Sequence, residues 1–393
     1  MEAASQMKPE AWTVSSNEAL KLSLVDDDGA VQFSPTFTYP IYGDSEQIFG
    51  YQDLQIFLVF DSVTFKPFTN VKYGAKLMDT VDDVQTKLLN YLPKDDVIIR
   101  DEMKWVDTFS KEREEFELPD DRFKVKSYNV DENNYTIYKV KLQEAAIKAL
   151  HRRMQIFTLL FIESASYIDE DDEGWEIFLT FNAKTKQCVG YSTTYQYWKY
   201  TGGPNFDNNE NSFTTGKISQ FMVFPPYQGN GHGSYLYNAI VDVYQSDPQV
   251  LEITVEDPNE SFDSLRDRND YLRLKNSGIA AAIPDELPIS EEWIEKEKGN
   301  CKIEKRQFMR LIEINLLSKS SPNFRLQVKK RLYEKNFDLL SDLDAATRND
   351  KLQTAFLLVK EEYEAMLSSI SSRKRTLSNN SGSSSKKIKL NNN

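Results

Sequence analysis

The sequence is poor in the residue types that build metal centres and disulfide frameworks. Its 393 residues include only two cysteines and two histidines. Cys188 and Cys301 lie far apart, whereas a zinc site or a disulfide scaffold needs clustered or regularly spaced cysteines. His151 and His232 are too few for a histidine-based metal centre. These shortages predict a protein that uses no metal ion and folds in a reducing compartment.

Long apolar runs are absent as well. No stretch approaches the roughly 20 apolar residues that a membrane-spanning helix needs. The opening residues, MEAASQMKPEAW, lack the basic region followed by an apolar region that marks a secretory signal. The composition, 40% hydrophobic and 12% aromatic, is that of a globular protein, and the length favours two or three domains. We therefore expect no membrane association.

Basic residues are scarce outside the C-terminal end. The chain has 61 acidic and 48 basic residues, a net charge of −13. Six of the basic residues and no acid lie in 371–393, so residues 1–370 carry about −19. Nucleic-acid binding depends on basic surface, so we expect no direct contact with nucleic acid. An acidic body instead attracts a basic partner over long range.

The most informative stretch is 217–258. It predicts a strand, a proline stop, a glycine-rich turn, a helix and a second strand that ends in two acids. In chain order these are Lys217 to Phe224, Pro225 and Pro226, Gln228 to Gly233, Ser234 to Tyr244, Leu251 to Val255, and Glu256 with Asp257. A glycine-rich turn that opens a helix presents free N–H groups and the positive end of the helix dipole. This stretch therefore predicts an anion site next to carboxylates.

Two nucleotide-binding patterns do not fit this turn. A P-loop needs Lys and Ser or Thr after its last glycine, but Gly233 is followed by Ser234 and Tyr235. A dinucleotide fingerprint needs a glycine in its sixth place, which Ser234 occupies. The anion expected here is therefore not bound by either motif.

The flanking sequence alternates strand and helix patterns. Strands are expected at 51–60, 135–142, 175–181, 188–198 and 278–283, and helices at 80–92, 143–163, 263–277 and over much of the chain from 290. Residues 101–118 mix charged and aromatic residues without a clear period. The order around the central stretch is thus strand, helix, two antiparallel strands, strand, glycine turn, helix, strand.

The turn and its surroundings resemble a known superfamily. Gln228-Gly-Asn-Gly-His-Gly233 matches the Q/R-x-x-G-x-G/A pyrophosphate turn of the GNAT acetyltransferases, whose element order is the same. Three longer strings resemble the catalytic subunits of type B histone acetyltransferases, of the fungal kind. They are FIESASYIDEDDEGWEIF (161–178), ISQFMVFPPYQGNGHGSYLY (218–237) and ITVEDPNESFDSLRDRND (253–270). The resemblance covers most of residues 35–325.

The resemblance implies an α/β fold with four parts. An α/β N-terminal domain (1–125) is expected to precede a GNAT acetyltransferase domain (126–277), a mixed sheet with flanking helices. A helical C-terminal domain (278–370) follows, and its pattern is read from the sequence alone beyond about 325. Residues 371–393 are rich in Ser, Asn and Lys, and this composition predicts disorder.

The resemblance also implies a reaction: acetyl transfer from acetyl-CoA, with no metal, to a lysine in the tail of newly synthesised histone four. A free lysine has a pKa near 10.4, so a general base must take its proton. Glu256 stands in VEDP, where the family has its catalytic glutamate, and Asp257 and Glu163 are the alternates. Adjacent side chains on a strand point to opposite faces, so one of Glu256 and Asp257 should face the cleft.

The family's binding positions map onto two groups of residues here. Those expected at the coenzyme are Phe221, Met222, Val223, Gln228, Gly229, Asn230, Gly231, His232, Gly233, Ser234, Asn259, Ser261 and Arg268. Those expected at the histone tail are Asp44, Ser45, Glu46, Trp175, Thr194, Tyr195 and Gln196. The acidic run 169–173 would add negative field to the second group.

Several of these residues have a plainer reading. Trp175 and Tyr195 equally suit the core of a hairpin, and Arg268 equally suits an ion pair on a helix surface. His232 is expected to shape the turn rather than to catalyse. Cys188 reads as a small core residue, which favours direct transfer over an acetyl-cysteine intermediate.

The resemblance further implies a WD-repeat histone chaperone as partner. Arg373-Lys-Arg375 and Lys386-Lys-Ile-Lys389 have the spacing of a bipartite nuclear import signal, which predicts a protein of cytoplasm and nucleus. A nonspecific basic arm is the alternative. For the whole chain, the alternatives are a histone-binding escort with weak or no catalysis and a GNAT enzyme for small amines.

Overall fold

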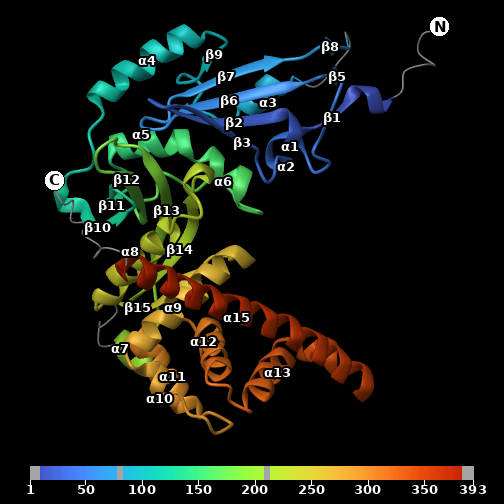
Figure 1. The fold of residues 1–393 in the computed structure, drawn as a ribbon, viewed down its shortest axis with the longest axis vertical. Helices are drawn as coiled ribbons and strands as arrows, with labels where there is room; N and C mark the ends of the chain where they lie inside the picture. Colours follow the sequence, from blue (N-terminus) through green and yellow to red (C-terminus); the bar gives the residue numbers. More distant parts are fainter. Residues whose placement is uncertain (1–8, 78–82, 208–212, 383–393) are drawn as a thin grey trace, which may run out of the picture. The chain divides into compact units, whose positions relative to one another are not determined.

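The computed structural model describes residues 9–77, 83–207 and 213–382, with side chains for all of these except 9, 204, 205 and 372–382 (Figure 1). The chain forms two compact units, Met1–Glu256 and Asp257–Asn393. Within the described ranges, no helix has both the length and the apolar character needed to cross a bilayer. Nor do these ranges hold a cluster of three or more His, Cys, Asp or Glu side chains suited to a metal ion.

The first unit begins with a five-stranded sheet in the order β3-β2-β6-β7-β9. Neighbouring strands alternate between antiparallel and parallel pairing across it. The strands are β2 (Leu20–Asp26), β3 (Gly29–Phe33), β6 (Gln55–Asp61), β7 (Pro67–Lys72) and β9 (Ile98–Ile99). Short elements flank it: η2 (Pro9–Trp12), β1 (Thr13–Ser15), α1 (Ser16–Ala19), α2 (Tyr39–Tyr42), β4 (Gln47–Phe49), β5 (Tyr51–Gln52), β8 (Ala75–Lys76) and α3 (Val84–Leu89).

The aperiodic segment 101–118 contains a helix, α4 (Glu102–Glu115). Trp105 and Phe109 are its only buried residues. Its apolar face is thus a single i, i+4 pair, which is too short to show a helical period of hydrophobic residues in the sequence. The two rings pack with Phe68 and Ile98 of the sheet. Asp101 caps the helix by accepting from the Lys104 N–H at 3.0 Å.

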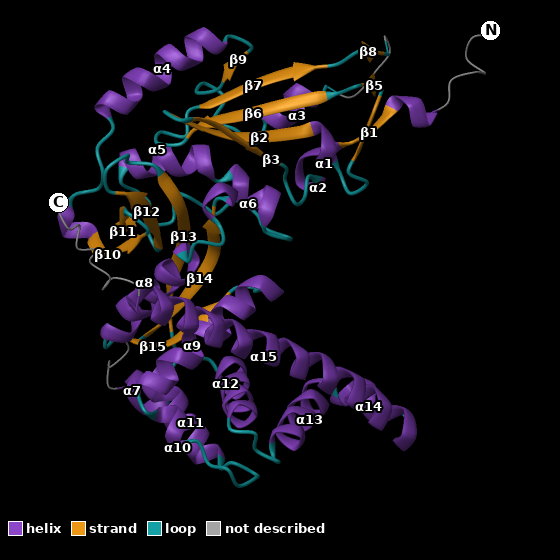
Figure 2. Ribbon diagram, in the orientation of Figure 1, coloured by secondary structure: helices purple, strands orange, loops and turns teal. Residues whose placement is uncertain are grey.

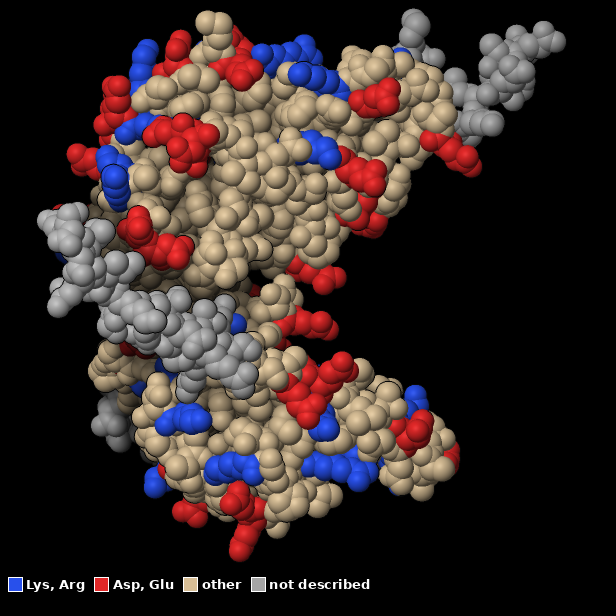
Figure 3. All heavy atoms as spheres, viewed as in Figure 1, with Lys and Arg blue, Asp and Glu red and all other residues tan. Residues whose placement is uncertain are grey.

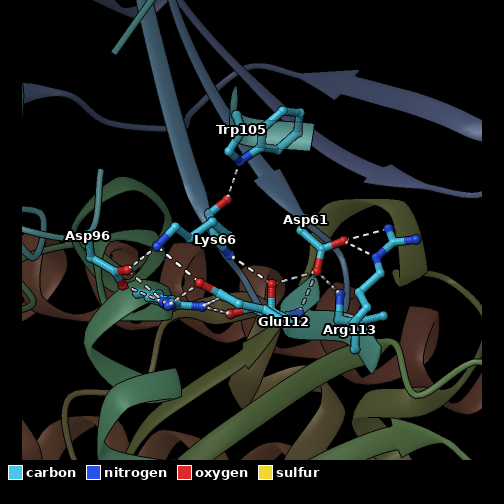
Figure 4. A network of polar contacts seen from close by, with 9 residues as sticks. Asp61, Lys66, Asp96, Trp105, Glu112 and Arg113 are labelled. Carbon is cyan, nitrogen blue, oxygen red and sulfur yellow. Dashed lines mark hydrogen bonds and ion pairs between the residues drawn. The ribbon is translucent and has the colours of Figure 1, made fainter. Parts of the chain in front are cut away.

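A network of charged side chains fastens α4 and α5 (Ala145–Met154) to the first sheet (Figure 4). The Arg153 guanidinium binds Glu112 at 2.6 Å and Asp96, and it donates to the Thr64 carbonyl at 2.9 Å. Lys66 reaches the same two acids. The fully buried Asp61 carboxylate pairs with Arg113. Each charge in the network thus has a partner of opposite sign.

A six-stranded sheet follows in the order β10-β11-β12-β13-β14-β15. All neighbours are antiparallel except β14 and β15, which are parallel. The strands are β10 (Lys124–Val130), β11 (Asn133–Lys141), β12 (Trp175–Asn182), β13 (Cys188–Trp198), β14 (Thr214–Val223) and β15 (Val250–Val255). Other elements are η3 (Asp121–Phe123), α6 (Ile156–Phe161), α7 (Gly203–Asp207), η4 (Pro225–Tyr227) and α8 (His232–Ser246). This confirms the expected mixed sheet with flanking helices, and it adds β10.

The helix expected at 143–163 is two helices, α5 and α6, that meet at Gln155. At this junction the Thr158 N–H bonds to the Gln155 carbonyl at 3.0 Å, an i→i+3 contact that tightens the chain. The break lets both helices bury apolar faces.

The two sheets of the first unit share one hydrophobic core, so the boundary expected at residue 125 does not separate compact units. The Phe60 ring of β6 lies 4.9 Å from that of Phe157 on α6. Phe65 lies 4.8 Å from Phe224, which follows β14. Burial of these rings stabilises both halves together.

The second unit consists of helices (Figure 2). They are α9 (Glu260–Asn276), α10 (Ile279–Ala282), α11 (Glu291–Cys301), α12 (Lys305–Ser318), α13 (Phe324–Lys335), α14 (Phe337–Ser341) and α15 (Ala345–Gly382). The strand expected at 278–283 is therefore wrong, because this short apolar run starts a helix after Gly278, which has a φ of 83°.

Two boundaries of this unit differ from expectation. The unit starts at Asp257 rather than 278, because α9 packs with α12 and shares its core. Asp267 of α9 binds Arg310 of α12 through two nearly buried side chains. Helix α15 continues to Gly382, whereas disorder was expected from 371, and residues 383–393 lie outside the described part.

Replacing Arg153 with Met should destabilise the first unit by about 2–3 kcal/mol, because Asp96 and Glu112 lose one of their two shared cations and keep only Lys66. Burial raises the pKa of Asp96, but the hydrogen bonds and charges of Arg153 and Lys66 outweigh it and hold this pKa below its usual range. That contribution is present above about pH 4 and disappears as acid protonates the carboxylate, so the difference should shrink there. Urea denaturation followed by tryptophan fluorescence measures it.

The matched control is Lys126→Met, which removes a more exposed pair with Asp242 in the same unit. That pair should contribute less than about 1 kcal/mol. Equal denaturation midpoints for the two variants would contradict a stabilising role for the Arg153 network.

Candidate functional site

The site is built where β14 and β15 stop pairing. Their parallel register runs from Thr214 to Ile218 on β14 and ends with the Glu256 N–H donating to the Ile218 carbonyl at 2.9 Å. Strand β14 continues to Val223, still paired with β13 on its other edge. The two strands therefore diverge just before Phe221, Met222 and Val223, the expected coenzyme strand.

The glycine-rich turn adopts a backbone that only glycine takes easily. Gly229 has a φ of 81° and Gly231 a φ of 92°, both left-handed. The Gln228 side chain donates to the Val223 carbonyl at 2.8 Å and so closes the turn. A Cβ at Gly229 would meet nothing within 4 Å. The turn is thus shaped from within and faces open space.

Helix α8 starts at this turn without a side-chain cap. Its N-cap is Gly231, and the Gly231 carbonyl accepts from the N–H groups of Ser234 and Tyr235. Among the described residues, the N–H groups from Gly229 to Gly233 make no backbone hydrogen bond. Together with exposed Gln228, Gly229 and Asn230, they form an anion cradle at the positive end of a 15-residue helix.

His232 anchors the turn, as the sequence predicted. Its imidazole is buried, with Nδ1 2.7 Å from the Tyr128 hydroxyl and the ring edge-on to Tyr135 at 4.5 Å. Burial lowers the pKa of His232, so the ring is neutral at physiological pH. Only its backbone can face an anion.

These features fit the pyrophosphate and pantetheine of coenzyme A. An uncapped helix end, two left-handed glycines and open space before them suit a pyrophosphate. The diverging strand beside them suits an extended arm that makes main-chain hydrogen bonds. The expected residues 221–223 and 228–234 are thus neighbours in space, linked by the hydrogen bond from Gln228 to Val223.

Glu256 follows β15 directly and is held by two groups of β14. Its Oε1 is 2.8 Å from the Lys217 ammonium, and its Oε2 accepts from the Ser219 hydroxyl. Partial burial favours the neutral acid, but these hydrogen bonds and the Lys217 charge outweigh it, so the pKa of Glu256 lies below its usual range. The carboxylate is therefore ionised at neutral pH and fixed in orientation.

The two alternate bases have different surroundings. Asp257 is exposed, has a φ of 36° and is the first residue of the second unit. Glu163 is exposed on the loop after α6, which is held by the Tyr39 hydroxyl at the Ser164 N–H (2.6 Å) and by Gln220 at the Ser166 carbonyl (2.9 Å). Of the three, Glu256 is the one fixed to β14 where the strands part.

Trp175 and Tyr195 share a sheet face with the acid. Trp175 pairs with Tyr195 across β12 and β13, and Tyr195 pairs with Lys217 across β13 and β14. Directly opposed residues of neighbouring strands point to the same face. The two rings pack edge to face at 5.0 Å, and the Tyr195 hydroxyl donates to Asp172 at 3.1 Å. Both rings are only half-buried, so they offer an aromatic surface in line with Lys217.

Other residues expected at the substrate have structural partners. Thr194 is fully buried on the opposite face, and the Gln196 side chain accepts from Thr214 at 3.2 Å. Glu46 accepts from the N–H groups of Thr38 (2.6 Å) and Tyr39, and thereby caps α2. The structure thus does not bring Thr194 or Glu46 to the site as free side chains. Asp44 and Ser45 are exposed on the preceding turn.

The acidic run 169–173 is partly neutralised. Glu170 pairs with Arg152, and Asp171 pairs with Lys148 at 2.6 Å. Figure 3 likewise shows acidic and basic side chains interspersed over the visible face of the first unit. The exposed Asp169 and Glu173 remain the members of the run that add negative field.

Three expected coenzyme residues belong to the second unit. The Asn259 side chain caps α9 by accepting from the Phe262 N–H at 2.9 Å. Ser261 is exposed and Arg268 is half-buried on the same helix. Their part in coenzyme binding stays a prediction.

Lys217 and Ser219 were missed from the sequence. A signal was available, because they alternate with Ile218 along the strand and so share a face just before the glycine turn. What the sequence did not show is that β15 places Glu256 beside that face.

Comparison with known families finds three matches along the chain. Residues 12–163 match the family described as "Histone acetyl transferase HAT1 N-terminus". Residues 145–262 match the "Acetyltransferase (GNAT) family", and residues 267–321 match "Fungal HAT1, C-terminal". The glycine turn and Glu256 both lie in the GNAT match.

Curated relatives match over nearly the full chain. A protein of Kluyveromyces lactis is 59% identical over 388 residues, which cover 98% of this chain and all of the relative. One of Eremothecium gossypii is 54% identical, covering 95% and 96% of the two chains. One of Candida glabrata is 52% identical, covering 97% and 98%. Each is named "Histone acetyltransferase type B catalytic subunit".

Among solved structures, an aminoglycoside acetyltransferase from a soil metagenome matches at 16% identity with a TM-score of 0.24, covering 35% of this chain and 85% of that one. Arabidopsis thaliana Naa50 in complex with a bisubstrate analogue matches at 18% identity with a TM-score of 0.23, covering 36% and 82%. At these scores we draw nothing further from them.

Replacing Gly231 with Ala should weaken coenzyme A binding by at least about tenfold, because a left-handed φ costs an L-residue roughly 1–2 kcal/mol and tilts the N–H groups of the cradle. Titration calorimetry with coenzyme A measures the affinity, and thermal unfolding reports the strain.

The control is Gly299→Ala in α11, another glycine with open space but without a positive φ. It should leave binding unchanged and stabilise its helix slightly. Unaltered coenzyme affinity in Gly231→Ala would show that the turn is not the pyrophosphate site.

Proposed function

This chain belongs to the family of type B histone acetyltransferase catalytic subunits, and on that premise we propose that its acceptor is a lysine in the tail of newly synthesised histone four. It is a GNAT enzyme that transfers acetyl from acetyl-CoA to histone. We further propose that Glu256 is the general base and that the acetyl group passes directly to the lysine.

The observation that carries the proposal is the placement of Glu256. Its carboxylate is ionised and held by Lys217 and Ser219 at the point where β14 leaves β15. Phe221 to Val223 and the glycine turn follow on the same strand. A base is thereby fixed next to the strand that would carry the thioester arm.

Each part of the site has a task in the transfer. Bound acetyl-CoA supplies the acetyl group as a thioester. The N–H groups of Gly229 to Gly233 would hold the pyrophosphate, and Glu256 would take the proton from the substrate ammonium so that the amine can attack the thioester carbonyl. The C–N bond would form as the C–S bond breaks, with coenzyme A leaving as the thiolate. The aromatic pair Trp175 and Tyr195 lies on the face along which the lysine would approach.

Direct transfer is supported by the state of Cys188. This thiol is fully buried, and burial raises its pKa to about 12. It is therefore protonated and shielded from substrate, which opposes an acetyl-cysteine route. The other cysteine, Cys301, is buried in the second unit.

The choice of histone four and of a WD-repeat histone chaperone as partner rests on the family resemblance. The acidic body supports a basic, extended substrate. A histone escort with a degenerate core is less well supported, because the turn, the uncapped helix and the anchored Glu256 are all intact. A small-amine acetyltransferase has no need of the extended aromatic surface.

We also propose that residues 373–389 act as an import signal and give the enzyme access to cytoplasm and nucleus. The side chains of this segment lie outside the described part, so the proposal rests on the spacing of its basic clusters. A reporter fused to 371–393 that fails to enter the nucleus would contradict it.

A histone-four tail peptide should be a far better substrate than spermidine, by at least about a hundredfold in kcat/KM, because the acidic body attracts its basic residues and the aromatic pair Trp175 and Tyr195 can contact residues beside the lysine. Mass spectrometry of each acceptor after incubation with acetyl-CoA identifies the products. Comparable rates for spermidine would favour the small-amine alternative, and coenzyme binding without any product would favour the escort.

Replacing Glu256 with Gln should lower kcat at neutral pH by about 10²–10⁴-fold and leave coenzyme A affinity unchanged, because it removes the proton acceptor alone. The control is Glu252→Gln, which removes an acid of β15 that pairs with Lys199 away from the divergence point. Unchanged turnover in Glu256→Gln would show that the base assignment is wrong.

A further inference from the structure

An ammonium group of the enzyme itself touches the acid assigned as base. The Nζ of Lys217 lies 2.8 Å from Glu256 Oε1, and the two side chains are 28% and 43% exposed. A substrate lysine must bring its own ammonium to the same carboxylate. The Lys217 ammonium therefore lies at the place where the ammonium of the substrate lysine must lose its proton.

The backbone fixes this contact from both sides. Lys217 is opposed by Tyr195 on β13 and by Thr254 on β15. A β-bulge at Thr193 and Thr194 leaves Ser219 as an additional residue on β14, and its hydroxyl reaches Glu256 Oε2. Bulges re-aim side chains next to active sites. Both carboxylate oxygens are thus taken by β14 groups on one short segment.

Stability alone does not account for the pair. An ion pair this exposed contributes roughly 0–1 kcal/mol to folding. The same sheet has other such pairs, among them Lys199, which follows β13, with Glu252 of β15. That pair lies on the paired part of β15, whereas Lys217 with Glu256 lies where the strands part.

We propose that Lys217 is a positioning residue for acetyl transfer: it orients the Glu256 carboxylate, and its positive charge disfavours the ammonium form of the incoming lysine. This inference rests on the proposed role of Glu256 as base. Lys217 itself does not exchange a proton with the substrate.

The physical basis is repulsion between like charges. A cation held beside a bound amine lowers the pKa of that amine, because protonation would place two positive charges together. The groups facing Glu256 from β14 are Lys217 and Ser219, and on β15 its neighbour on the same side is the neutral Thr254. Within these contacts, Lys217 is the source of positive charge.

Lys217→Met should lower kcat for a histone peptide at pH 7 by about tenfold or more, with the KM for acetyl-CoA unchanged. The pH dependence of kcat reports groups in the enzyme–substrate complex. Without the neighbouring cation the bound amine keeps a higher pKa. The rising limb of the plot of kcat against pH should therefore move to higher pH by about one unit. Lys217→Arg keeps the charge and should restore the wild-type profile.

The matched control is Lys199→Met, which removes another cation that pairs with an acid of β15 and should leave the rising limb of the pH profile in place. Coenzyme A affinity and thermal unfolding establish that each variant is folded, and Lys217→Gln replaces the Met variant if that one is not. A neutral variant with an unshifted limb, or an Arg variant that behaves like Met, would overturn the proposal.

The two hypotheses fail differently. Turnover that survives in Glu256→Gln removes the base assignment and this inference with it. Loss of turnover in Glu256→Gln together with a wild-type profile in Lys217→Met removes this inference alone.

Discussion

The divergence of β14 from β15 is the constraint on which the site depends. Parallel pairing holds the two strands from Thr214 to Ile218 and ends in one hydrogen bond, from the Glu256 N–H to the Ile218 carbonyl. Beyond that bond, β15 is followed by the Glu256 carboxylate, whereas β14 continues toward the glycine turn. A continuous ladder would have filled the gap with backbone hydrogen bonds and left no edge for a ligand. The uncapped start of α8 follows the same strand through the glycine turn, so the divergence of the strands positions both the anion cradle and the proposed base.

That geometry depends in turn on a core that reaches well beyond the acetyltransferase sheet. Phe224, the residue after β14, packs against Phe65, which lies between β6 and β7, and against Phe157 from α6. Arg153 ties α5 to Asp96 and Glu112 of the N-terminal part. The N-terminal elements therefore help to fix the proposed coenzyme strand, although they also have a small cluster of their own around Trp105 and Phe109. A reading of 1–125 as an independent domain overlooks this shared burial.

Sequence reasoning succeeded where the signal is local. The alternation of 217–224, the two prolines and the glycines define strand, stop and turn by steric rules that act over a few residues. It failed where the outcome depends on neighbours. Helix α4 was missed because one buried pair, Trp105 and Phe109, gives no period, and the short run IAAAI was assigned to a strand although it forms α10. Lys217 escaped because its contact with Glu256 arises from the register of β15, and the cap that Glu46 provides to α2 was not foreseen either.

The low pKa of Glu256 is at first sight a poor property for a base, since a weaker base has less drive to take a proton. The larger obstacle, however, is the substrate. A lysine with a pKa near 10.4 is protonated at pH 7 by more than three units, roughly 4–5 kcal/mol. A carboxylate with a higher pKa could overcome only part of this free-energy cost. As its pKa rose to about 7, a growing fraction of the carboxylate would already be protonated and could not act as a base. A cation beside the carboxylate acts on the amine instead, and it also keeps the acceptor ionised. Lys217 lowers the pKa of Glu256 and, in our proposal, also the pKa of the substrate amine. The rate of transfer increases if the pKa of the amine falls by more than the pKa of Glu256.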